Sequence, residues 1–91
     1  MGSASLKVAG GKLVKAKVEA ADGVITSARI TGDFFLHPEE TLAEIESVLT
    51  GQPLNETALT AAIFSVLERN RAQLIGATPQ DFAKVLLEAS K

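Results

Sequence analysis

The chain has 91 residues, a net charge of −2 and no cysteine, and these facts exclude several classes of protein at once. A chain this short is expected to form one domain, spanning residues 1–91. It buries only about 60–65% of its unfolded surface, so a large internal ligand cavity is not expected. Without cysteine there is no disulfide framework, no thiolate metal site and no thiol nucleophile. The nine Lys and Arg residues form no basic stripe interleaved with aromatics, which argues against a nucleic-acid partner.

The beginning of the chain and its hydropathy indicate neither secretion nor a membrane. Residues 1–5 lack the basic and apolar regions of a signal peptide, and no apolar run is long enough to span a bilayer. Leu6 stands where a myristoylation pattern needs Ser or Thr. We therefore expect a cytoplasmic protein without a membrane partner, in which residues 1–5 are disordered or left over from cloning.

The first third of the chain alternates in the manner of antiparallel strands. On a strand over residues 13–20, four apolar side chains share one face: Val14, Ala16, Val18 and Ala20. A return strand over residues 24–31 offers a corresponding set: Val24, Thr26, Ala28 and Ile30. A three-residue turn at 21–23 would set Ala20 opposite Val24 and keep both apolar faces on one side.

A shorter strand at Leu6 and Val8 precedes these two, and Gly10-Gly11-Lys12 joins it to them. The Gly-Gly-Lys run lacks the spacing of a phosphate loop, because Leu13 follows where Ser or Thr is needed and a strand follows where a helix is needed. We interpret the run as a tight turn between strands, and the sheet as having about three strands.

The remaining two thirds predict three helices. The first follows Pro38 and ends at Gly51, with an apolar stripe of Leu42, Ile45, Val48 and Leu49. The second begins after Asn55, with a stripe of Leu59, Ala62, Ile63, Val66 and Leu67. The third opens with the near capping box Thr78-Pro79-Gln80-Asp81. Strands followed by helices indicate an α+β fold, a small antiparallel sheet of about three strands followed by three helices packed on one face.

The segment Gly32-Asp33-Phe34-Phe35-Leu36-His37-Pro38-Glu39-Glu40, between the last strand and the first helix, is where function should be sought. Neighbouring residues of an extended segment point to opposite sides, so the two Phe rings cannot enter one core in the same way. Two interpretations stay open: the whole segment plugs the core, or one ring belongs to the core and the other to a contact surface. The second interpretation predicts that one ring is exposed.

Other candidate sites are weaker. His37 with Asp33, Glu39 and Glu40 matches no established metal-ligand spacing, so we favour a structural turn and expect no metal site. No Ser lies in a strand–turn–helix elbow, and we assign no catalytic residue. Phe64 and Leu87 lie off their helix stripes, and we place both in the core, with a second contact surface as the alternative.

Three stretches together resemble the C-terminal accessory domain of lipoate–protein ligases: Lys7-Val8-Ala9-Gly10-Gly11-Lys12-Leu13, Gly23-Val24-Ile25 and Ile30-Thr31-Gly32-Asp33-Phe34-Phe35. The likeness continues to Gly51-Gln52-Pro53-Leu54 and covers roughly the first 55 residues. It is nearest to the free-standing form of this domain, the separate small subunit of lipoate–protein ligases found mainly in archaea, and the length of the chain fits that form.

The resemblance implies a fold similar to NifU-type iron–sulfur scaffolds and SufE-type sulfur acceptors, although the lack of cysteine argues against sulfur relay. It implies an accessory subunit, non-catalytic alone, that is required with a large catalytic subunit for ATP-dependent activation of lipoate to lipoyl-AMP. The lipoyl group then passes to a lysine of an acceptor protein, an indirect partner. Lipoate, ATP and Mg would bind at the large subunit and no cofactor at this chain alone. The alternative is a non-enzymatic interaction module on a NifU-like fold, unrelated to lipoate.

A subunit of this kind needs a preshaped surface, and we expect that surface at two loops. Its expected interface residues are Gly10, Gly11, Lys12, Gly32, Asp33, Phe34, Phe35, Leu36 and His37. Glycines let another backbone approach closely, and one Phe supplies a desolvated anchor.

Overall fold

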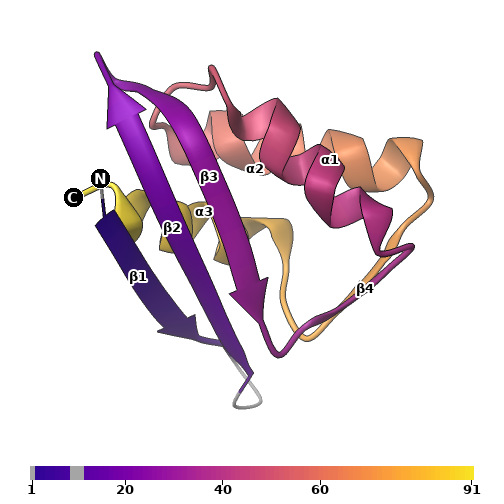
Figure 1. Cartoon of the computed structure of the whole chain (residues 1–91). Helices are drawn as coiled ribbons and strands as arrows, with labels where there is room; N and C mark the ends of the chain where they lie inside the picture. Colours follow the sequence, from indigo (N-terminus) through magenta and orange to yellow (C-terminus); the bar gives the residue numbers. More distant parts are fainter. Residues whose placement is uncertain (1, 9–11) are drawn as a thin grey trace.

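The structure, a computed structural model, describes residues 2–8 and 12–91. Its elements, in chain order, are β1 (Gly2–Lys7), β2 (Leu13–Ala21), β3 (Val24–Gly32), β4 (Phe35–His37), α1 (Glu40–Leu49), α2 (Glu56–Arg69), β5 (Gln73–Ile75) and α3 (Pro79–Ala89). Strands β1, β2 and β3 form an antiparallel sheet in that order, and β4 pairs with β5 in a separate two-stranded ribbon (Figure 1). The α+β prediction is confirmed; the ribbon was not predicted.

The helices lie on one face of the three-stranded sheet and leave its other face open (Figure 1). Helix α1 packs against β3, α3 packs against β1 and β2, and α2 packs against both of these helices. Between the layers lies one apolar core, to which all three helices contribute fully buried side chains, among them Ile45, Ile63 and Phe82. The sheet residues that face away from the helices, such as Lys15 and Lys17, are exposed.

The hairpin between β2 and β3 is tighter than the three-residue turn that we expected. Asp22 and Gly23 alone make the turn, with φ of 55° and 80°. Positive φ at both central residues matches the twist of the flanking strands. Ala21 therefore pairs with Val24 and Ala20 with Ile25, and the expected Ala20–Val24 pairing is wrong.

A β-bulge beside this turn changes which β3 residues face the core. The register shifts at Glu19/Ala20, so that Thr26 is an extra residue on β3. Ile25 and Ala28 are both buried, whereas Val24, which we placed on the inner face, is 36% exposed. An inserted residue reverses the alternation of a strand, and the simple period of two in the sequence cannot reveal it.

Strand β1 begins at Gly2, so residues 2–5, which we expected to be disordered or left over from cloning, belong to the sheet. Their partners run antiparallel along β2, with Gly2 opposite Val18. Gly2 also lies against the end of α3, where a Cβ atom would overlap the carbonyl oxygen of Ala89. Strand β1 is thus held by β2 along one edge and by α3 from one face.

The helix ends follow the predicted capping chemistry. The Asn55 Oδ1 atom accepts a hydrogen bond from the Ala58 N–H at 2.9 Å. The capping box of α3 is complete, because Thr78 Oγ1 accepts from the Asp81 N–H and Asp81 Oδ2 accepts from the Thr78 N–H. Gly51 follows the end of α1 with φ of 91°, as expected for a residue that ends a helix.

Helix α2 ends in a hydrogen-bonding pattern that turns the chain directly into β5. Arg71 has a left-handed φ of 49° and donates its N–H to the Glu68 carbonyl at 3.1 Å. The Ala72 N–H reaches back to the Leu67 carbonyl at 2.9 Å, which completes a Schellman motif. This cap sets the direction in which Gln73–Ile75 leaves the helix.

Candidate functional site

The two adjacent Phe residues lie in different environments. Phe34 is half-buried, and its ring meets that of the fully buried Phe82 edge to face, with centroids 5.0 Å apart. Phe35 is 54% exposed and lies parallel to the His37 imidazole at a centroid distance of 6.2 Å. The prediction that one ring of the pair is exposed is confirmed, and Phe35 is that ring.

The β4–β5 ribbon places a second apolar side chain beside Phe35. Phe35 pairs with Ile75, and Leu36 pairs with Leu74. Leu36 is only 7% exposed and joins the core, whereas Ile75 is 57% exposed. Cross-strand partners have Cβ atoms about 4.5–5.5 Å apart, so Phe35 and Ile75 form one continuous apolar patch. We call this patch, with the adjoining His37, the ribbon surface.

Sequence reasoning did not identify Ile75. The available signal was weak: Leu74 and Ile75 form a two-residue apolar run between two helices, ahead of Gly76. A strand of three residues is too short to show a period, and its partner β4 lies far away in the sequence. Only the fold brings Ile75 next to Phe35.

Gly32 makes the path from the sheet to the ribbon possible. Its φ is 153°, and a Cβ atom on it would overlap the carbonyl oxygen of Leu13. The same carbonyl accepts a hydrogen bond from the Asp33 N–H at 2.8 Å. Close approach of two backbones, rather than space for a partner, therefore accounts for glycine at this position. Asp33 itself is exposed at the start of the ribbon.

The structure brings Lys12 next to this junction. A Cβ atom built on Gly76 would lie 3.4 Å from Lys12 Cγ and 3.4 Å from Phe34 Cα, so Lys12, Phe34 and Gly76 meet at one end of the molecule. The Lys12 carbonyl accepts from the Val8 N–H at 2.8 Å. Gly10 and Gly11, the other expected interface residues, lie outside the described residues.

A shallow open groove of about 450 Å³ lies between the edge of β3 and the start of α1. Four of the expected interface residues line it, namely Gly32, Phe34, Phe35 and Leu36. Along the same edge the Glu46 carboxylate accepts a hydrogen bond from the Ile30 N–H at 2.9 Å. The ribbon surface therefore adjoins a concave edge of the sheet.

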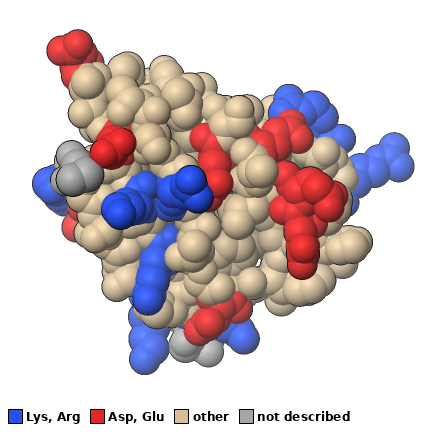
Figure 2. All heavy atoms as spheres, in the orientation of Figure 1, with Lys and Arg blue, Asp and Glu red and all other residues tan. Residues whose placement is uncertain are grey.

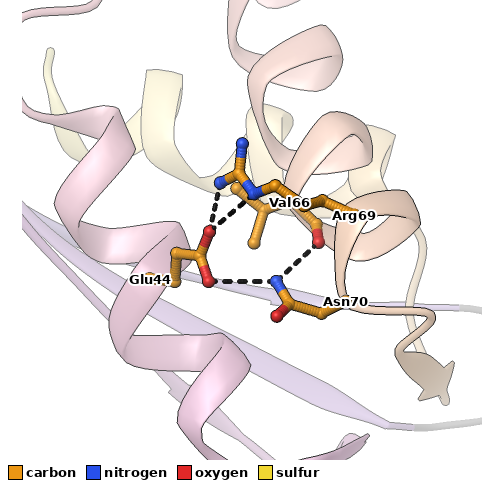
Figure 3. Close-up of polar contacts among 4 residues, drawn as sticks. All are labelled: Glu44, Val66, Arg69 and Asn70. Atoms are coloured by element: carbon orange, nitrogen blue, oxygen red, sulfur yellow. Dashed lines mark hydrogen bonds and ion pairs between the residues drawn. The ribbon is translucent and has the colours of Figure 1, made fainter.

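A polar cluster joins α1, the helix that follows β4, to α2, the helix that precedes β5 (Figure 3). The Glu44 carboxylate on α1 accepts hydrogen bonds from the Arg69 guanidinium and, at 3.0 Å, from the Asn70 amide at the end of α2. Asn70 Nδ2 also donates to the Val66 carbonyl at 2.9 Å. The hydrogen bonds from Arg69 and Asn70 hold the pKa of Glu44 below its usual range. This cluster holds the start of β5 near α1, which follows β4.

Phe64 is a further position where the structure corrects the sequence interpretation. Its ring is 54% exposed on α2 rather than buried in the core, and it borders an open hollow of about 560 Å³ beside Pro79. Leu87, by contrast, is half-buried and packs against the core as predicted.

The described residues contain no group of three or more His, Cys, Asp or Glu side chains placed to hold a metal ion. Within the same residues, no helix is long and apolar enough to cross a membrane. What the site offers chemically is shape and apolar area: a two-stranded ribbon with two exposed hydrophobic side chains beside a groove.

The family model of the bacterial lipoate protein ligase C-terminus matches residues 3–86. The chain therefore belongs to this family of ligase domains. Among solved structures it is similar to a chain from the structure of the bipartite lipoate protein ligase and its E2 lipoyl domain of Thermoplasma acidophilum. The two share 24% identity with a TM-score of 0.79, over 92% of this chain and 91% of the other, and this likeness shows a common fold. No match was found among the curated proteins.

Proposed function

We propose that this chain is the accessory subunit of a two-part lipoate–protein ligase. In this proposal it binds a large catalytic subunit in the cytoplasm and is required for the ATP-dependent activation of lipoate to lipoyl-AMP. The lipoyl group then passes to a lysine of an acceptor protein. Membership of the ligase C-terminal family supports the proposal, as does a fold shared with a chain of a bipartite ligase structure.

The observation that carries the proposal furthest is the ribbon surface. Phe35 and Ile75 are each more than half exposed and lie side by side, although 18 other hydrophobic residues of the described part of the chain are buried in the core. Contiguous exposed hydrophobic side chains mark protein contact surfaces, in which a few residues carry most of the binding free energy. We assign the ribbon surface and the adjoining groove to the catalytic subunit.

In this proposal the two subunits have different roles, and the role of this chain depends on its surface. Lipoate, ATP and Mg bind at the large subunit, and this chain contributes no catalytic residue. A bound accessory domain can order a loop around the adenylate and exclude water from the reactive mixed anhydride. Both effects need a stable shape rather than a nucleophile, and the Phe34–Phe82 contact and the polar cluster of Glu44 stabilise that shape.

ATP–pyrophosphate exchange in the presence of lipoate tests the proposal. The large subunit alone, this chain alone and the equimolar mixture are compared, with no acceptor protein present. We expect exchange only in the mixture. Equal exchange by the large subunit without this chain, or lipoyl-AMP formation by this chain alone, would overturn the proposal.

A further inference from the structure

Strand β1 lies at one edge of the three-stranded sheet, and within the described residues no hydrogen bond is made to its outer side (Figure 1). The Val8 N–H donates to the Lys12 carbonyl at 2.8 Å, and residues of an antiparallel pair alternate between hydrogen-bonded and free. The backbone groups of Ser3, Ser5 and Lys7 therefore point away from β2. We call these three residues the β1 edge. They form a row of unpaired donors and acceptors of the kind that pairs with another strand.

The opposite edge of the sheet, along β3, is closed by the chain itself. The Ile25 N–H donates to the Gln52 carbonyl at 2.9 Å, and the Gly51 N–H donates to the Ile25 carbonyl at 2.7 Å. Farther along the strand, the Glu46 carboxylate accepts from the Ile30 N–H. Over its six described residues β1 has no proline and no register shift, and its only charge lies at its last residue. The devices that usually block an edge strand are thus missing from β1.

An open hollow of about 460 Å³ lies next to β1 on the helix side of the sheet. Its apolar lining comes from Leu6 of β1, Leu54 ahead of α2 and Leu87 of α3, each of which is only half-buried. A strand added at the β1 edge would turn every second side chain toward this hollow. Backbone pairing combined with a pocket for alternate side chains is how proteins recognise an extended segment by strand addition.

The charges around the hollow favour a second copy of this chain as the partner. Two cations and two carboxylates line it, namely Lys84, Lys91, Glu56 and Glu88. Lys91 pairs with Glu88 at 3.2 Å, and among the described residues Lys84 and Glu56 form no ion pair. A surface that carries both signs in equal number can face itself across a two-fold axis with unlike charges in contact.

We propose that two copies of this chain associate through the β1 edge, with their β1 strands antiparallel across a two-fold axis. The outward-pointing residues of the two strands must face each other. The register that pairs all three sets Ser5 opposite Ser5 of the second copy, and Ser3 opposite Lys7. No two cations of the β1 strands then face each other. On the helix side, Leu6 of each copy lies opposite Ala4 of the other, and the two sheets become one continuous sheet.

Edge pairing also keeps apart the cations of the open sheet face. Figure 2 shows Lys and Arg following the strands on this face, so two copies stacked face to face would bring like charges together. Lys15 lies beside Ser5 on β2, and in the edge-paired dimer three strand spacings, about 14 Å, separate it from its counterpart. This distance exceeds the Debye length of about 8 Å at physiological ionic strength.

Sedimentation equilibrium of the isolated chain tests the inference. We expect the weight-average mass to rise from 9.5 kDa toward twice that value between about 1 and 500 µM, as for a small interface. Ser5→Pro removes an outward N–H but no N–H of the ladder with β2, and proline is tolerated at such edge positions. It should stay monomeric, whereas Ser5→Thr, which keeps the N–H, should associate like the wild type. A monomeric wild type, or equal association by Ser5→Pro, would overturn the inference.

Cross-linking checks the register without removing a backbone donor. The chain has no cysteine, so Ser5→Cys and Ser3→Cys each place a single thiol on an exposed position of β1. In the proposed register the two Cα atoms at position 5 lie about 5.5 Å apart, within reach of a disulfide. Those at position 3 are offset by four residues, more than about 13 Å, which is too far. With oxidised glutathione we expect Ser5→Cys to form the disulfide dimer about tenfold faster; equal rates would refute the pairing.

Binding of the catalytic subunit keeps this inference separate from the proposed function. The ribbon surface shares no residue with the β1 edge or its hollow, so self-association leaves the ribbon free. We expect Ser5→Pro to bind the catalytic subunit as tightly as the wild type at concentrations where both are monomeric. Weaker binding would assign the β1 edge to a strand of the catalytic subunit and overturn the inference. If the catalytic subunit binds neither protein, the proposed function fails, and the sedimentation and cross-linking results still decide on self-association.

Discussion

The three-stranded sheet and the β4–β5 ribbon of this small domain expose opposite kinds of side chain. The sheet buries its apolar side chains under the helices and exposes charge, while the ribbon exposes two apolar side chains, Phe35 and Ile75. The sheet is built largely from adjacent stretches of chain, whereas the ribbon joins strands on either side of α1 and α2. A pair of three-residue strands is not stable alone, so the ribbon depends on contacts with the rest of the domain.

Those contacts are few and can be changed one at a time. Leu36 points from β4 into the core, Phe34 packs on Phe82, and the cluster of Glu44, Arg69 and Asn70 holds the helices that flank the ribbon. The exposed patch is therefore held in place by the core and is not a frayed end. Variants at these contacts should therefore separate domain stability from partner binding.

The largest effect is expected from Phe82→Ala, which removes both a fully buried core side chain and the ring under Phe34. We expect the free energy of unfolding to fall by about 3–5 kcal/mol, measured by urea denaturation. The exposed Phe35→Ala serves as the control and should cost less than about 1 kcal/mol. Equal costs for the two variants would contradict the burial of Phe82 and the exposure of Phe35.

Gly32→Ala should cause the next largest loss of stability, because Gly32 lies where the chain leaves the sheet for the ribbon. Its Cβ would overlap the Leu13 carbonyl, and its φ of 153° disfavours any side chain. We expect a loss of about 2–3 kcal/mol by the same measurement. Gly51→Ala is the matched control, since Gly51 also has positive φ but open space around it, and should cost about 1 kcal/mol. If Gly51→Ala costs as much, the close approach at Leu13 is not the cause.

Glu44→Gln should give a smaller effect that depends on pH. The folded pKa of Glu44 lies below its value of 4.5 in the unfolded chain, since Arg69 and Asn70 donate hydrogen bonds to the carboxylate. Its contribution to stability is therefore present above that value and is lost as the pH falls through the folded pKa. Urea midpoints should show wild type and Glu44→Gln differing near neutral pH and converging in acid. Glu68→Gln, the same substitution at an exposed position of α2 outside the cluster, is the matched control.

Much of the fold could be predicted from the sequence because local chemistry determines it. Alternation predicted β2 and β3, the 3.6-residue period predicted the helices, and Asn55 and Thr78 were recognised as caps. The bulge at Thr26 was missed because its position depends on strand twist and turn geometry, to which the alternation pattern is blind. Strand β5 was missed because three residues carry no period and its pairing with β4 is not local.

The candidate site was half predictable for the same reason. The doublet of Phe34 and Phe35 led to the hypothesis that one ring is exposed, beside the alternative that the whole segment plugs the core, and strand geometry did not say which ring it would be. Ile75 and the exposed Phe64 needed the fold, because exposure at a helix position off the main stripe depends on which neighbours cover it. In this fold no other element covers the Phe64 ring fully, and the ring is 54% exposed.

The measurement that tests the central claim most directly is the affinity of the catalytic subunit for Phe35→Ala and Phe64→Ala, by isothermal titration calorimetry. The two side chains are each 54% exposed, so the variants remove similar accessible area from two different surfaces. We predict that Phe35→Ala weakens binding by about 2–4 kcal/mol while Phe64→Ala leaves it within about 0.5 kcal/mol of wild type. Loss of affinity with Phe64→Ala alone would contradict the assignment of the ribbon surface to the catalytic partner.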